Sequence, residues 1–107
     1  MSLYSVEFDP RAAEEALRLP VRLRSRLKEN LEFLRAGPFR SHPGVRVKEI
    51  RELRGVWRFH LDPRRRVFYT TLESVLVVVM VDVNAGITAR TRAELRRRLI
   101  QERPRPH

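Results

Sequence analysis

The sequence predicts a single α+β domain in the order β-α-α-β-β-β-β, with one further helix at the C-terminus. Two observations predict this class. Residues 10–36 carry apolar side chains at helical spacing, and residues 45–83 form short alternating or continuously apolar segments separated by turn residues. A chain of 107 residues suits one hydrophobic core, so residues 1–107 are expected to form one domain. We expect a mostly antiparallel sheet with a helical hairpin packed on one face.

The N-terminal part is expected to hold a strand and a helix. Residues 3–8 alternate between apolar and polar side chains, which is the period of a strand. Asp9 and Pro10 then favour a helix start, because aspartate caps free amides and proline fits the first helical position. The apolar stripe of this helix is expected to comprise Ala13, Ala16 and Leu17.

A second helix is expected between the break at Leu19-Pro20 and the stop signal at Gly37-Pro38. Leucines recur in it at three- and four-residue spacing, which predicts a buried stripe. These leucines are Leu23, Leu27, Leu31 and Leu34. The short connection predicts that the two helices form an antiparallel hairpin.

Four strands are expected over residues 45–53, 56–61, 66–71 and 75–81. The first does not alternate cleanly, so we expect a bulge near Lys48 and Glu49. In the next two strands, apolar residues occupy one face, and Arg58, His60 and Arg66 share the other. The last strand is apolar throughout, which is typical of a central position in a sheet.

The C-terminal region, residues 91–107, is expected to form a helix over 91–102 and a frayed basic tail. Thr91 and Glu94 have the spacing of a capping box. The narrow apolar stripe of this helix is expected to comprise Leu95, Leu99 and Ile100.

The formal net charge is +10, and it is unevenly distributed. Residues 40–66 carry nine basic and three acidic side chains, whereas residues 67–83 carry no basic one. Such a field predicts a polyanionic partner, either nucleic acid or an acidic protein. The absence of cysteine excludes disulfides and thiolate chemistry, and without a signal peptide we expect a cytoplasmic protein.

Three short motifs carry a resemblance to a known family. They are residues 4–8, the Leu53-Arg54-Gly55-Val56-Trp57-Arg58 step and the Arg66-Val67-Phe68-Tyr69 step. Together with the element order, they resemble the RelE/ParE superfamily of toxins from type II toxin–antitoxin pairs, closest to the RelE-like branch. The likeness covers about residues 3–90.

The resemblance implies a metal-independent endoribonuclease that cleaves messenger RNA in the ribosomal A site and is neutralised by an acidic antitoxin. It implies catalytic roles for Arg58, His60 and Arg66, without a metal or cofactor. Further contacts to RNA or the ribosome are expected from basic residues near this face, namely Lys48, Arg54, Arg64, Arg65 and Arg90.

The chemistry of RNA cleavage assigns different tasks to these residues. Arg58 and Arg66 suit the negative charge that develops on phosphate, whereas His60 is the one plausible proton carrier, with Glu49 and Glu52 as alternative bases. The RNA-cleaving members usually carry a further Arg or His after the last strand and a Tyr or His near the C-terminus. Residues 82–88 offer neither, and no tyrosine follows Tyr69, so two other readings stay open. They are a non-catalytic inhibitor of DNA gyrase, as in the ParE branch, and an RNA-binding relic.

Overall fold

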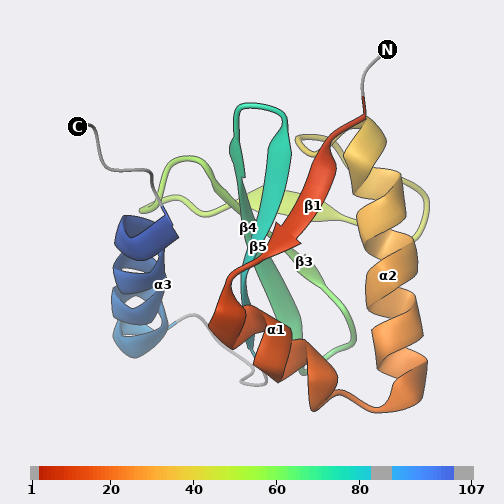
Figure 1. Cartoon of the computed structure of the whole chain (residues 1–107), viewed down its shortest axis with the longest axis horizontal. Coiled ribbons are helices and arrows are strands. Elements are labelled where there is room, and N and C mark those ends of the chain that lie inside the picture. Colours follow the sequence, from red (N-terminus) through yellow and green to blue (C-terminus); the bar gives the residue numbers. More distant parts are fainter. Residues whose placement is uncertain (1–2, 83–87, 103–107) are drawn as a thin grey trace.

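The computed structural model describes residues 3–82 and 88–102 and has the predicted order of elements (Figure 1). Five strands form one sheet in the order β1-β5-β4-β3-β2, in which β1 and β5 are parallel and all other neighbours are antiparallel. The elements are β1 (Ser5–Phe8), α1 (Pro10–Leu17), α2 (Val21–Ala36), β2 (Val47–Glu49), β3 (Val56–His60), β4 (Arg66–Leu72), β5 (Val75–Asp82) and α3 (Ala89–Glu102). The predicted α+β class is confirmed.

Helix α1 begins as the sequence predicts. The Asp9 carboxylate accepts a hydrogen bond from the Arg11 backbone N–H at 2.8 Å, and Pro10 occupies the first turn. The predicted apolar stripe is partly wrong, because Ala12 is the fully buried residue and Leu17 is 69% exposed. The helix therefore meets the sheet through Ala12, and Leu17 lies on its exposed side.

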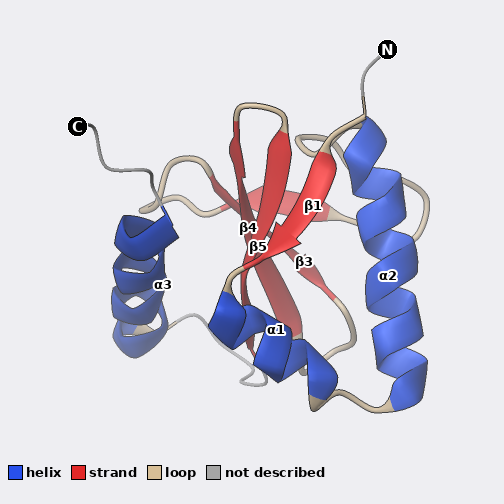
Figure 2. Cartoon of the chain, viewed as in Figure 1, coloured by secondary structure: helices blue, strands red, loops and turns tan. Residues whose placement is uncertain are grey.

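Helix α2 buries its four leucines against the sheet, as its spacing predicts. The two helices lie on the same face but splay apart instead of packing as a close hairpin (Figure 2). An apolar groove of about 520 Å³ remains between them, lined by Val6 and Phe8 of β1 and by Leu27 and Leu31 of α2, among others. The α1–α2 pair therefore covers the sheet incompletely.

The strand expected over residues 45–53 is shorter than predicted. Pairing in β2 ends at Glu49, and residues 50–55 form a turn in which the Ile50 N–H donates to the Val56 carbonyl at 2.8 Å. The expected bulge near Lys48 is therefore wrong, because the change of parity at Ile50 marks the end of the strand. A register shift lies instead between Phe68 and Tyr69, where β4 pairs with β5.

Both faces of the sheet bury apolar side chains. The face under α1 and α2 holds residues such as Phe59, Val67 and Tyr69, and the Tyr69 hydroxyl donates to the Pro38 carbonyl at 2.6 Å. The opposite face holds a second cluster, which includes Phe68 of β4 and Leu95 of α3. Because β5 lies between β1 and β4 and its side chains are buried on both faces of the sheet, its apolar run belongs to the core, as predicted for a central strand.

Helix α3 starts before its predicted capping box. The helix begins at Ala89, and the Thr88 hydroxyl accepts a hydrogen bond from the Thr91 N–H at 3.2 Å. Glu94 does not cap this helix but bonds to arginines. Leu95 is buried and Leu99 packs against the second cluster, whereas Ile100 is 66% exposed, so the predicted stripe is wrong at its last member.

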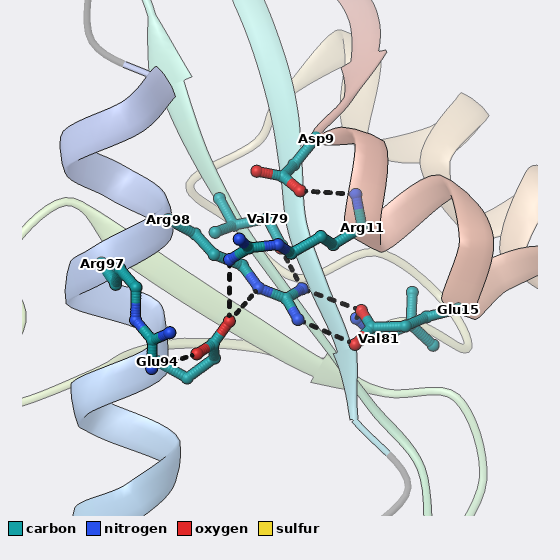
Figure 3. A network of polar contacts seen from close by, with 8 residues as sticks. All are labelled: Asp9, Arg11, Glu15, Val79, Val81, Glu94, Arg97 and Arg98. Carbon is teal, nitrogen blue, oxygen red and sulfur yellow. Dashed lines mark hydrogen bonds and ion pairs between the residues drawn. The ribbon is translucent and has the colours of Figure 1, made fainter.

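A buried arginine anchors α3 to the rest of the domain (Figure 3). The Arg98 guanidinium donates to both carboxylate oxygens of Glu15 on α1, at 2.9 and 3.0 Å, and to the Val79 carbonyl on β5 at 2.9 Å. Its Nε donates to Glu94 at 2.9 Å. Burial alone would lower the pKa of Arg98, but its hydrogen bonds to Glu15 and Glu94 raise it above the ordinary value.

Each helix within residues 3–82 and 88–102 is too short or too polar to span a lipid bilayer.

Candidate nucleic-acid interface

Arg58, His60 and Arg66 emerge from neighbouring strands on one face of the sheet. Alternation along β3 places Arg58 and His60 on the same side, opposite Trp57 and Phe59. His60 lies directly across from Arg66 of β4, and residues in direct register point to the same face. The strand pattern thus brings two guanidinium groups and an imidazole together.

The two polar side chains of β3 are bonded to each other. Arg58 Nη1 lies 2.9 Å from His60 Nε2. Because a guanidinium can only donate hydrogen bonds, the imidazole accepts through Nε2, and the ring proton is then on Nδ1. The contact holds His60 as a neutral ring with its lone pair directed at Arg58.

The electrostatics of this face favour an anion. Partial burial, followed by the charges of Arg58 and Arg66, lowers the pKa of His60 below its ordinary value, against a smaller raising effect of its hydrogen bond to the Asp62 backbone. Burial and the charge of Arg66 likewise lower the pKa of Arg58. A bound phosphate would relieve this mutual repulsion of cations, so the face is suited to a negatively charged ligand.

We predict that His60 titrates below the ordinary histidine value of about 6.5. Arg58→Met should raise the His60 pKa, because the substitution removes a nearby positive charge. The measurement is an NMR titration of the His60 imidazole protons in both proteins. An unchanged or lower His60 pKa in Arg58→Met would contradict the electrostatic coupling.

The remaining basic residues expected at the interface are dispersed. Lys48 of β2 is directly opposite Arg58 and shares its face. Arg54 and Arg64 are exposed in the turns at opposite ends of β3. Arg65 forms an ion pair with Asp62 at 2.6 Å, and Arg90 is exposed in the first turn of α3.

The two alternative bases border a hollow next to Arg58. This hollow, of about 450 Å³, is lined by Lys48, Glu49, Ile50, Arg51, Glu52, Arg58 and Arg92. The Glu49 carboxylate accepts a hydrogen bond from the Gly55 N–H at 2.9 Å, which ties it to the turn before β3. Gly55 adopts a φ of 85°, a conformation that glycine adopts readily, so this turn depends on its glycine.

Sequence reasoning did not assign Arg51 and Arg92 to the site. Arg51 lies in a turn that was expected to be part of a strand, so its position beside Arg58 could not be predicted. Arg92 carries a usable signal: it precedes Leu95 by three residues and Leu99 by seven, which places it on the helix face that meets the sheet. Across residues 3–82 and 88–102, no cluster of three or more histidine or carboxylate side chains could hold a metal ion.

Solved structures with the same architecture come from bacterial and archaeal toxins. The E. coli toxin RelE, a mutant in the free state, superposes with a TM-score of 0.71 at 23% identity, over 91% of this chain and 98% of that one. The chain has the RelE-like toxin fold. No protein-family model and no curated protein matches the sequence.

Two further solved structures share the RelE-like fold. The RelBE2 toxin–antitoxin complex of Mycobacterium tuberculosis matches with a TM-score of 0.62 at 24% identity, over 77% of this chain and 99% of that one. The YoeB dimer of Staphylococcus aureus matches with a TM-score of 0.65 at 13% identity, over 74% of this chain and 94% of that one. At such identities the likeness describes the fold, and function has to be argued from the basic face.

Proposed function

We propose that the protein is the toxin of a type II toxin–antitoxin pair and acts as a ribosome-dependent endoribonuclease that cuts messenger RNA in the A site. The observation that carries this proposal is the convergence of Arg58, His60 and Arg66 on one exposed face of a RelE-like fold. The matched toxins support the proposal, since four of the matched structures are RelB–RelE toxin–antitoxin complexes.

The proposed reaction is an internal transfer of the phosphate. The 2′-oxygen forms a bond to the adjacent phosphorus, and the bond from phosphorus to the 5′-oxygen breaks, which leaves a 2′,3′-cyclic phosphate and a 5′-hydroxyl. His60 takes the proton from the 2′-hydroxyl, and water supplies a proton to the departing 5′-oxygen. Arg58 and Arg66 stabilise the charge that develops on the phosphoryl oxygens.

The hydrogen bond between Arg58 and His60 implies that phosphate binding comes before proton transfer. In the free protein, His60 Nε2 accepts a hydrogen bond from Arg58, so this nitrogen is not available to accept a proton. A phosphate that draws the Arg58 guanidinium into a bidentate contact would release Nε2 toward the sugar hydroxyl. The lowered pKa of His60 keeps the ring neutral at pH 7, as a base must be.

The proposed partner is an acidic antitoxin. The net charge of +10 complements an acidic protein, and the apolar groove between α1 and α2 lies beside the outer edge of β1. Antitoxin-bound relatives such as RelBE share the fold. The same positive charge would also favour ribosomal RNA, so the antitoxin and the ribosome are expected to compete for the protein.

A test in cells separates cleavage from the gyrase alternative. The gene is induced, messenger RNA 5′ ends are mapped, and plasmid topology is measured in the same cultures. Breaks in phase with codons are expected, with unchanged supercoiling. Intact transcripts together with relaxed or cleaved DNA would refute the proposal in favour of a gyrase inhibitor, and intact transcripts with intact DNA would leave only an RNA-binding relic.

A further inference from the structure

The hollow beside Arg58 is built from three separate parts of the chain. Lys48 comes from β2, Arg51 from the turn after it, and Arg92 from the first turns of α3. Arg58 of β3 closes the side toward His60. Four cationic side chains thus surround one depression, although they are far apart in the sequence.

None of these four cations is matched by a carboxylate. No ion pair of the described side chains involves Lys48, Arg51, Arg58 or Arg92, and the Arg58 guanidinium is bonded to His60 Nε2. Glu49 and Glu52 also border the hollow, but Glu49 is bonded to the Gly55 amide. Positive charge therefore dominates a concave surface, which is the electrostatic arrangement of an anion site.

The position of Arg92 is fixed from behind by the packing of α3. Leu95 is fully buried against the second cluster, and Leu99 packs at its edge. One turn further, Arg98 anchors the helix to α1 and β5 (Figure 3). Arg92 precedes Leu95 by about one turn on the same face, so this docking directs it toward the strands and not into solvent.

We propose that this hollow binds a backbone phosphate of the RNA strand next to the phosphate being cleaved, and that Arg92 is the binding residue through which α3 completes the subsite. The inference rests on the proposed function, because it places the cleaved phosphate at Arg58, His60 and Arg66. Arg58 borders both places, so a strand that crosses this face can occupy them with consecutive phosphates. Guanidinium groups bind phosphate by paired hydrogen bonds, which suits Arg51 and Arg92.

The test is binding of a short fluorescent 2′-O-methyl RNA, which cannot be cleaved because its 2′-hydroxyls are blocked. Arg92→Gln should weaken binding about five- to tenfold at about 0.1 M salt and should reduce the salt dependence by about 0.7, the value for one phosphate contact on a single strand. Arg92→Lys keeps the charge but loses the paired hydrogen bonds, so its affinity should fall between those of Arg92→Gln and the wild type. Arg22→Gln, an exposed site on α2 on the opposite side of the sheet, is the matched control for the loss of one charge and should bind normally.

A second variant tests whether misfolding could explain a loss of RNA binding. Glu52→Gln takes a negative charge from the same hollow and should tighten binding several-fold, which a damaged protein would not do. Equal affinity of Arg92→Gln and the wild type, in a protein that cleaves messenger RNA on ribosomes, would overturn this inference and leave the proposed function standing. Failure of the wild type both to bind this RNA and to cleave would overturn both.

Discussion

Arg66→Ala is expected to abolish growth arrest while the protein stays folded. Arg66 lies at the start of β4 and faces outward beside His60, so its loss leaves the apolar core intact. Removal of a donor that stabilises transition-state charge typically costs about 10²- to 10³-fold in rate. The measurements are colony formation after induction and the rate of messenger RNA cleavage on programmed ribosomes.

The control for Arg66→Ala is Arg22→Ala, which removes the same charge from the exposed surface of α2. That variant should retain toxicity, since it lies on the other side of the sheet. Circular dichroism and thermal unfolding establish that both variants are folded. Full toxicity of a well-folded Arg66→Ala protein would show that the active surface lies elsewhere.

Arg98→Met is expected to cause the largest loss of stability among single polar substitutions. The Arg98 side chain is 7% exposed and donates to Glu15, Glu94 and the Val79 carbonyl. Methionine preserves much of the volume but removes a donor from the Val79 carbonyl and from both carboxylates, of which Glu15 keeps the Val81 N–H and Glu94 keeps Arg11 and Arg97. Because both carboxylates remain about a quarter exposed and can be hydrated, we expect a loss of about 2 kcal/mol, or about 10 °C in Tm.

The matched control for Arg98→Met is Arg97→Met. Arg97 also forms an ion pair with Glu94, at 2.8 Å, but its side chain is 63% exposed. Arg97→Met should therefore change the free energy of unfolding by about 0.5 kcal/mol or less. Thermal and urea unfolding of the two variants measure the difference, and equal stabilities would show that the buried network does not hold α3.

The strands that carry the basic face could be predicted from the sequence because their signal is local. Alternation in β3 fixes which side chains share a face, and the turn at Asp62-Pro63 brings β4 back beside it. The common face of Arg58 and His60 follows from a period of two residues alone. The start of α1 could be predicted for the same reason, since its cap, Asp9, is next to the helix in the sequence.

The docking of α3 could not be predicted in the same way. The sequence spacing placed Ile100 in the apolar stripe and did not single out Arg98, whereas the structure exposes Ile100 and buries Arg98. Arg98 is buried because it pairs with Glu15, which is 83 residues away in the sequence and comes close only in the folded protein. Arg92 was left outside the site for the same reason, because its neighbours in the hollow come from β2, β3 and the turn between them.

The most direct test of the proposed function is cleavage by the purified protein on ribosomes programmed with a defined messenger RNA. A cut in the A-site codon is expected that yields a 2′,3′-cyclic phosphate and a 5′-hydroxyl and is lost in Arg66→Ala. An intact message after prolonged incubation with wild-type protein, or cleavage that persists unchanged in Arg66→Ala, would contradict it.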